Sequence, residues 1–462
     1  MPNTNNVNIN ESLFHIDGKP SIGKSFPIAV QHLLAMIIGN TLPALVLTNA
    51  VKGTQFEIPS GDAIYIIQAG MFIAAIATFL QLYPVLKVGA KLPVIMGVSF
   101  AYIPILIQIG TTYGYGAVFG AQIIGGVVAF IVGILIGKIR KYFPPIVSGT
   151  VVLTIGLSLY PVAIGYMAGG NGNPMYGSKY QWIVAIITLI TVLICNMFGK
   201  GLIKLAAILI GIIVGYVLSI IINSTVAPGF VNFSNIQNAD FFTYPRLLLF
   251  KPEFPVGAVI TMAIMYIVNS VQAVGDISST TVGGLDREAT DEEISGGIKC
   301  NGVASIIGGF IGALPTATYS QNVGIVSMTK VVARKVLAVT AVLIAIAGFI
   351  PKFGGLMMSI PQCVIGGATI SVFAQITMNG IKLITSEELS IRNSTVVGLG
   401  LALGMGITSV PAATEAMDPT LKMIFTSSPV VIATLVVFFL NIILPEKTIE
   451  QERKEREEMD RQ

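Results

Sequence analysis

The sequence has little charge and few side chains that bind metals. Only 11% of its 462 residues are Asp, Glu, Lys or Arg, whereas a soluble domain has about 25%. This shortage excludes a soluble enzyme, a disordered scaffold and a nucleic-acid-binding protein. The 2 histidines exclude a His-rich metal site, and we expect neither a metal nor a cofactor. The 3 cysteines, Cys195, Cys300 and Cys363, form no CxxC pair, which favours buried thiols over a disulfide framework.

Apolar residues take the place of the missing charge. They make up 53% of the chain, and at about 20 residues per crossing they suffice for a dozen or more membrane helices. The 49 glycines indicate close helix packing and broken helices. The sequence therefore predicts an all-α integral membrane protein with fourteen spanning segments, near 26–50, 61–86, 92–109, 115–137, 143–166, 180–198, 202–222, 255–278, 297–313, 315–330, 334–351, 356–379, 394–410 and 428–445.

The basic residues predict the orientation of these segments. An even number of crossings places both termini on one side, and sorting the 27 Lys and Arg residues by alternate loops puts 21 on that side and 6 on the other. By the positive-inside rule we expect the tails 1–25 and 446–462 to be cytoplasmic and the loop 223–254 to be extracellular. No cleavable signal precedes the first apolar segment, so we expect a multi-pass protein of the cell membrane.

Acidic residues are missing from two long stretches. No Asp or Glu lies between Asp62 and Asp240, or between Glu293 and Glu387. Asp276, in the run IMYIVNSVQAVGDISST, is a carboxylate that falls within or at the end of an apolar segment. A carboxylate in the membrane is costly and usually faces a cavity or a proton path. The alternative is that Asp276 caps the end of its helix in the headgroup layer.

The two halves of the chain carry matching marks. The third segment opens with Leu92-Pro93 and the tenth with Leu314-Pro315. A proline is followed five residues later by a glycine in both FPPIVSGT (143–150) and IPQCVIGG (360–367). These matches predict two seven-helix repeats, the second inverted because seven is odd. Interrupted helices at corresponding positions are typical of transporters, where half-helix N-termini bind a polar or weakly anionic planar molecule.

The densest polar run inside an apolar stretch is TATYSQNVGIVSMTK (316–330). Its Gln and Asn side chains offer donors and acceptors that suit the alternating N–H and C=O edges of a nucleobase. The pattern Gln321-Asn322-x-Gly324-x-x-x-x-Thr329-Lys330 resembles the signature of the nucleobase–ascorbate transporter family, also called nucleobase:cation symporter-2. The resemblance covers residues 25–445, and pairs in the first, third and eighth helices agree with it: Gln31-His32, Ser99-Phe100 and Gly275-Asp276.

This resemblance implies an architecture and a function. It predicts a core domain of helices 1–4 and 8–11 (26–137 and 255–351) and a gate domain of helices 5–7 and 12–14 (143–222 and 356–445). Short β-strands are expected in the broken helices 3 and 10. The family further implies a homodimer in the lipid bilayer and an elevator movement of the core against the gate. The implied function is import of a purine nucleobase, such as xanthine or urate, by proton symport, and no enzymatic activity.

The resemblance also assigns substrate contacts. Gln321 takes the position that hydrogen-bonds the base; Gln there is similar to the purine branch, and Glu to the uracil branch. Backbone groups at Ser99, Phe100 and Ser320 are expected to contact the base, with the Phe100 ring stacking on it. Three more residues of the motif are expected to hold the broken helix in shape or to tune selectivity: Asn322, Gly324 and Thr329.

Two positions depart from the family pattern. The eighth helix usually carries a Glu that binds substrate and couples protons, but Gln272 stands there, and Asn301 precedes Gly302 where the ninth helix often has an Asp. Gln272 is still expected to bind substrate, but an amide cannot exchange a proton near neutral pH. The coupling group is then Asp276 or His32, or the protein is uncoupled or coupled to another cation. For His32 the alternative is a structural hydrogen bond to a neighbouring helix.

Three other hypotheses compete with proton symport. A passive facilitator fits the two missing carboxylates. A membrane enzyme needs a nucleophile with a base, or a metal cluster, for which one embedded carboxylate and one membrane histidine do not suffice. An anion transporter with the same inverted architecture usually has a large cytoplasmic C-terminal domain, and the tail 446–462 is too short for one. Xanthine, urate, guanine, hypoxanthine and uracil all stay open as substrates.

Overall fold

The computed structural model describes residues 12–139, 142–170, 172–418, 421–422, 425, 428–445 and 448–459. Parts of both predicted tails, residues 1–11, 446–447 and 460–462, lie outside the described residues. Within the described ranges, 9 helices are long and apolar enough to cross a membrane, or 10 if one bent helix pair forms a single span. The chain is therefore a helical, multi-pass membrane protein.

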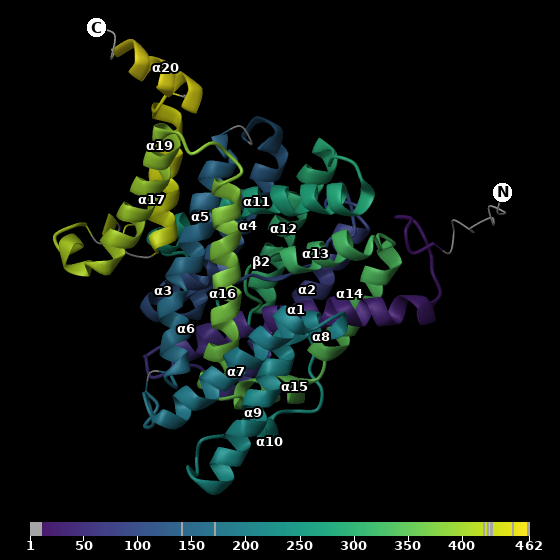
Figure 1. Ribbon diagram of the computed structural model, residues 1–462. Coiled ribbons are helices and arrows are strands. Elements are labelled where there is room, and N and C mark those ends of the chain that lie inside the picture. Colours follow the sequence, from purple (N-terminus) through teal and green to yellow (C-terminus); the bar gives the residue numbers. More distant parts are fainter. Residues whose placement is uncertain are drawn as a thin grey trace.

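The elements follow one another along the chain as labelled in Figure 1. In order they are α1 (Ile22–Val51), α2 (Ser60–Leu82), β1 (Met96–Val98), η2 (Phe100–Tyr102), α3 (Ile103–Tyr113), α4 (Tyr115–Ile139), α5 (Pro145–Ser158), α6 (Tyr160–Met167), α7 (Lys179–Phe198), α8 (Leu202–Leu205), α9 (Ala207–Thr225), α10 (Ser234–Asn238), α11 (Val256–Leu285), α12 (Asp291–Ile311), β2 (Thr316–Thr318), α13 (Ser320–Thr329), α14 (Arg334–Gly348), α15 (Pro351–Ser359), α16 (Gln362–Ile384), α17 (Ile391–Ser409), η4 (Pro411–Thr414), α19 (Pro429–Ile443) and α20 (Ile449–Met459).

Each predicted apolar segment contains one of these helices or a broken helix, but several bounds differ. α2 ends earlier than expected, at Leu82, and α11 continues past the expected end to Leu285. The single segment predicted at 356–379 is wrong. The chain breaks before Pro361, which has no N–H to continue a helix, so that α16 begins at Gln362. The residues before the break form α15, which bends by 77° against α14.

The helices pack in two groups. In the first, α4 packs against α11 and α12, α2 packs against α14, and α1 contacts α2, α3 and α14. In the second, α16 packs against α5, α6 and α7, while α7 pairs with α9 and α17 pairs with α19. Figure 1 shows α17 and α19 side by side at one edge of the bundle, with α20 extending away at the C-terminal end. Contacts between the groups are sparse and involve α11 with α5 and α19, and α1 with α8 and α9.

Pairs of glycines allow the closest helix contacts in both groups. A Cβ placed on Gly126 of α4 would lie 2.7 Å from the carbonyl oxygen of Gly302 in α12, and one on Gly302 would lie 2.5 Å from that of Gly126. Likewise, a Cβ on Gly149 of α5 would lie 2.9 Å from the carbonyl oxygen of Gly380 in α16, and one on Gly380 would lie 2.8 Å from that of Gly149. No larger residue fits at these backbone-to-backbone contacts, which explains part of the high glycine content.

The two broken segments meet in a short antiparallel pair of strands. β1 and β2 pair in the register Met96↔Thr318, Gly97↔Ala317 and Val98↔Thr316, so the predicted strands are present and adjacent. The Tyr319 hydroxyl donates to the Val98 carbonyl oxygen at 2.6 Å. Because that hydroxyl would lie 2.8 Å from a Cβ on Gly97, only glycine fits there. Beyond the strands begin η2 with α3 on one side and α13 on the other.

Candidate substrate-binding site

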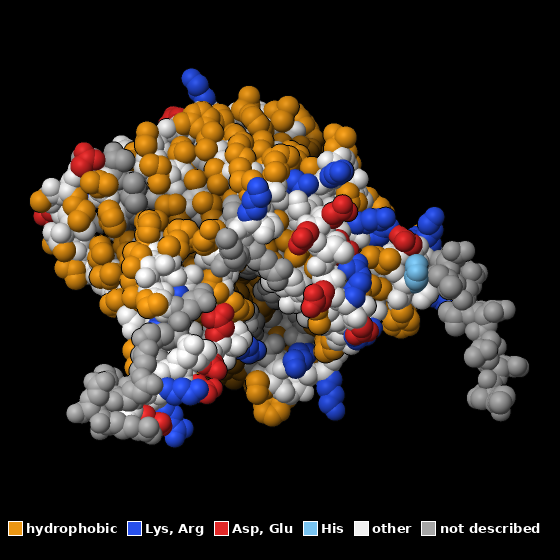
Figure 2. Space-filling view, turned by 90° about the horizontal axis from the view of Figure 1, so that it is seen from above, with side chains coloured by type: hydrophobic (Ala, Val, Ile, Leu, Met, Phe, Trp, Pro, Cys, Tyr) orange, Lys and Arg blue, Asp and Glu red, His pale blue; other side chains and the backbone are white. Residues whose placement is uncertain are grey.

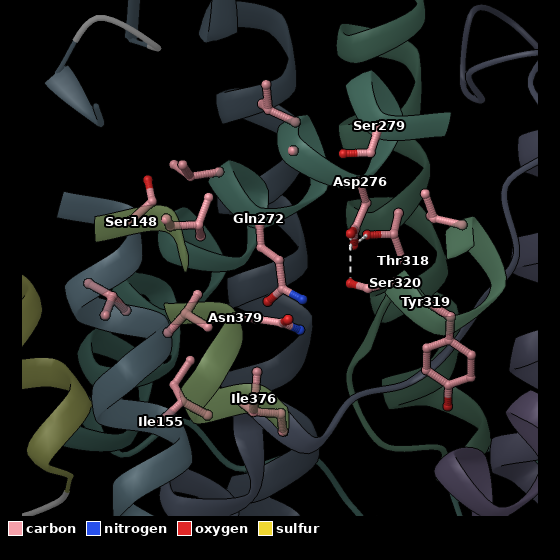
Figure 3. A pocket seen from close by; sticks show the side chains of 18 of the residues that line it. Ser148, Ile155, Gln272, Asp276, Ser279, Thr318, Tyr319, Ser320, Ile376 and Asn379 are labelled. Carbon is pink, nitrogen blue, oxygen red and sulfur yellow. Dashed lines mark hydrogen bonds between the residues drawn. The ribbon is translucent and has the colours of Figure 1, made fainter. Parts of the chain in front are cut away.

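A cavity of about 910 Å³ lies beside the strand pair, between the two groups of helices. Its walls come from η2, α11, β2 and α13 on one side and from α5 and α16 on the other (Figure 3). Seven of the residues singled out from the sequence line it: Ser99, Phe100, Gln272, Asp276, Ser320, Gln321 and Gly324. Four others are not among its described lining residues: His32, Asn301, Asn322 and Thr329.

Asp276 is the carboxylate of the cavity wall. Its side chain accepts hydrogen bonds from the Thr318 hydroxyl at 2.5 Å and from the Ser320 hydroxyl at 2.6 Å, as the dashed lines in Figure 3 mark. The residue is only 8% exposed, and α11 continues beyond it to Leu285. Asp276 therefore does not cap the end of its helix, and that alternative is wrong. Its carboxylate instead joins α11 to the strand β2 and to the start of α13.

Two amides face the same cavity. Gln272 precedes Asp276 by one turn of α11 and so shares its helix face. In Figure 3 its side chain points into the cavity, toward Asn379 of α16. Gln321 lies in the first turn of α13 and is exposed to the cavity. Each amide offers two N–H donors and a carbonyl acceptor, the groups that a heterocycle with mixed N–H and C=O edges requires.

Two helix starts flank these amides. η2 with α3 begins at Phe100, and α13 begins at Ser320. The first N–H groups of a helix have no partner within the helix and carry a partial positive charge, so both starts favour an electron-rich ligand edge. The Ser99 hydroxyl already accepts from the Ala101 N–H at 3.2 Å. The Phe100 ring packs edge-on against Phe373 of α16, with ring centroids 5.7 Å apart, at the contact between the two helix groups.

His32 and Asn322 form a structural pair behind the cavity. The Asn322 side-chain nitrogen lies 3.0 Å from Nδ1 of His32 and donates to the His32 carbonyl oxygen at 3.1 Å. Both residues are buried, and the pair joins α13 to α1. This arrangement matches the structural alternative for His32, since the imidazole faces an amide and not the cavity.

Asn301 and Thr329 likewise bond to protein groups. Asn301 donates to the Asn269 side-chain oxygen at 2.7 Å and accepts from the Thr316 hydroxyl at 3.0 Å, which connects α12 to α11 and β2. The Thr329 hydroxyl donates to the Ile325 carbonyl oxygen within α13, at 2.8 Å. The Asn301 contacts therefore support the strand β2 from α12, whereas the Thr329 bond lies within α13.

The polar lining residues that the sequence analysis did not single out include Ser148, Gln375, Asn379 and Lys382. The last three lie on α16 at spacings of four and three residues, which places them on one face of the helix. This spacing was the signal in the sequence, but the expected segment ended at residue 379 and left Lys382 outside it. Among the described residues, no group of three or more His, Cys, Asp or Glu side chains lies close enough to hold a metal ion.

A family model described as a permease family, Xan_ur_permease, matches residues 23–413. The chain belongs to this family. Among curated relatives of this permease, a putative purine permease (CPE0397) of Clostridium perfringens is 32% identical over 97% of this chain and 96% of its own length. The uric acid permease PucJ of Bacillus subtilis is 33% identical, over 91% and 92% of the two chains. The xanthine permease of the same organism is 31% identical, over 93% and 97%. These relatives are transporters and not enzymes, and the same holds for the family.

Solved structures share the fold at much lower sequence identity. The transmembrane domain of the cyanobacterial bicarbonate transporter BicA superposes with a TM-score of 0.56 and 13% identity, covering 93% of this permease and all of that chain. The murine anion transporter Slc26a9, described as inward-facing, gives a TM-score of 0.63 and 11% identity over 92% of this permease and 68% of that chain. At such identities the likeness concerns the fold alone, which is that of a membrane transporter.

Proposed function

We propose that this permease imports a purine nucleobase, xanthine, urate or a close relative, by proton symport. The observation that carries the proposal is the convergence of Gln272, Gln321 and two helix starts on one cavity whose wall holds the carboxylate of Asp276. Curated relatives with purine, uric acid and xanthine in their names support the substrate class. In this proposal Gln321 and Gln272 hydrogen-bond the edges of the base, and backbone groups at Phe100 and Ser320 bind its electron-rich side.

Asp276 is the proton carrier in this proposal. Its two oxygens accept from Thr318 and Ser320. A proton on the carboxyl group turns one of those oxygens into a donor, so one hydroxyl must reorient. Ser320 is also the first residue of α13, next to Gln321, and protonation thereby changes the substrate-binding helix start directly. His32 does not line the cavity, which supports Asp276 over it.

We propose further that the fourteen segments form two inverted repeats, divided into the core domain (26–137 and 255–351) and the gate domain (143–222 and 356–445). The packing supports this because contacts recur in corresponding pairs: α4 with α12 corresponds to α2 with α14, and α7 with α9 to α17 with α19. Sparse contacts between the groups suit an elevator movement of the core. A homodimer, with both termini cytoplasmic in the cell membrane, completes the proposal.

Purified protein in lipid vesicles tests this function. With an inward proton gradient, radiolabelled xanthine or urate should accumulate above its external concentration, and a protonophore should collapse the accumulation. Equilibration without accumulation would favour a passive facilitator instead. Accumulation that follows a sodium gradient and ignores the protonophore would assign the coupling to another cation.

A further inference from the structure

Two charged side chains occur among the described residues that line the cavity, Asp276 and Lys382. They differ in their surroundings. The Asp276 carboxylate is buried and accepts two hydroxyl hydrogen bonds. The Lys382 side chain is exposed, and in the part of the chain that the structure describes its ammonium group makes no hydrogen bond or ion pair. The cavity thus offers an unneutralised positive charge that the proposed mechanism does not use.

Lys382 lies at the mouth of the cavity. It belongs to the last turn of α16, and the lining includes other residues at helix ends: Ile136 near the end of α4, and Phe143 and Pro145 before and at the start of α5. Figure 2 looks onto this end of the molecule, where charged side chains surround a hollow near the middle. Low-dielectric walls around a charged opening focus the field along the entry path, which raises the local concentration of ligands of the opposite charge.

The other polar residues on this face of α16 lead from the mouth inward. Asn379 lies three residues before Lys382 and Gln375 four residues before Asn379, and both are exposed to the cavity. Figure 3 shows the Asn379 amide opposite Gln272, across the cavity from the core helices. A ligand that enters past Lys382 therefore meets amides on both walls, which are neutral and bind neutral and ionised bases alike.

We propose that Lys382 is a specificity-determining residue that favours purines carrying a negative charge, as the oxidised purine urate does at neutral pH. This inference rests on the proposed function, because it assumes that the cavity takes a purine. Hypoxanthine has fewer ring carbonyl groups to stabilise a negative charge and is neutral under the same conditions. The amides recognise the ring edges of both bases, and Lys382 adds an attraction that only the anion experiences.

The test compares initial uptake of urate and hypoxanthine at neutral pH by the intact protein in vesicles. Lys382→Gln should raise the KM for urate about tenfold, while the KM for hypoxanthine stays within about twofold. Lys382→Arg should keep the wild-type preference because it keeps the charge. Lys138→Gln is the matched control: Lys138 is exposed near the end of α4 and does not line the cavity, so this variant should alter neither KM.

Each outcome separates this inference from the proposed function. If wild-type protein transports neither base, the proposed function fails. If it transports both and Lys382→Gln changes the two KM values equally or not at all, only the inference on Lys382 fails. An effect of Lys138→Gln as large as that of Lys382→Gln would also overturn it. Should Lys382→Gln fail to fold, the wild-type protein supplies the answer: added salt must raise the KM for urate and leave that for hypoxanthine unchanged.

Discussion

The two halves of the permease brace their broken segments with different chemistry. Asn40 in α1 accepts the Val98 N–H through its side-chain oxygen at 2.8 Å, and Asp276 in α11 accepts the Ser320 hydroxyl at 2.6 Å. Val98 and Ser320 hold matching positions, each six residues after the leucine of a Leu-Pro pair. An oxygen acceptor on a long helix therefore supports each broken segment. Only the brace in the second half can take up a proton.

The comparison distinguishes residues that hold the broken segments in place from the residue proposed to couple transport to protons. A neutral amide suffices to hold the first strand, since Asn40 accepts the Val98 N–H through its side-chain oxygen. Asn301 makes the same point, since it holds Thr316 of β2 with an amide where the family often has an acid. Of these three braces, Asp276 alone also lines the cavity.

The largest effect on transport is expected when Asp276 is replaced by an amide, the group that Asn40 supplies in the first half. Asp276→Asn keeps the size and an acceptor oxygen but removes the exchangeable proton. We expect vesicles with this variant to equilibrate the base without accumulating it, while calorimetry shows that the base still binds. Asp62→Asn is the control, since Asp62 lies outside this cavity. Intact accumulation by Asp276→Asn would remove Asp276 from the mechanism.

The next effect is expected when a second acid is placed in the cavity together with Asp276. Gln321→Glu puts a carboxylate in the first turn of α13, next to Ser320, and replaces the two amide donors with acceptors alone. The KM for xanthine should rise about tenfold, or the preference should shift toward uracil, in competition assays with labelled base. Purine uptake and selectivity like those of the wild type would argue against Gln321 as a substrate contact.

The brace in the first half should affect stability and leave coupling unchanged. Asn40→Ala removes the acceptor of the buried Val98 N–H and should lower the free energy of unfolding by about 1–3 kcal/mol. Thermal unfolding in detergent measures this loss. The ratio of accumulated to external base should stay at the wild-type level in the surviving folded protein. A lost proton dependence would show that both halves take part in coupling.

The smallest effect concerns a contact far from the cavity, where the chain before α1 meets α14. The Arg334 guanidinium hydrogen-bonds Asp17 and lowers the pKa of that carboxyl below its usual 3.8. A lowered pKa stabilises the fold above the unfolded value, and this contribution is lost as the pH falls below about 4. Because Asp17 is largely exposed, Asp17→Asn should lower the free energy of unfolding by at most about 1 kcal/mol at neutral pH and should leave it unchanged in acid. Unfolding measured at several pH values tests this expectation. An equal loss at every pH would exclude the ion pair as its cause.

The sequence predicted those features that depend on local patterns. Apolar runs located the helices, the Leu-Pro pairs marked both broken segments, and the family resemblance supplied the expectation of short strands in them. The contact between His32 and Asn322 could not be predicted in the same way, because it joins residues far apart in the chain. The break before Pro361 was missed because the expected segment at 356–379 ran through this proline. The polar face of α16, with Asn379 and Lys382, became visible only once the helix bounds were known.

In the mechanism proposed above, the single lysine and the single carboxylate of the described lining would set the electrical character of transport. With Asp276 ionised and no substrate bound, the two charges cancel. With a proton on Asp276 and a monoanionic purine beside Lys382, they cancel again. Under that proposal the proton and the anion would cross as an electroneutral pair. Membrane voltage would then neither drive nor oppose the step, and the pH difference alone would set how far urate is concentrated.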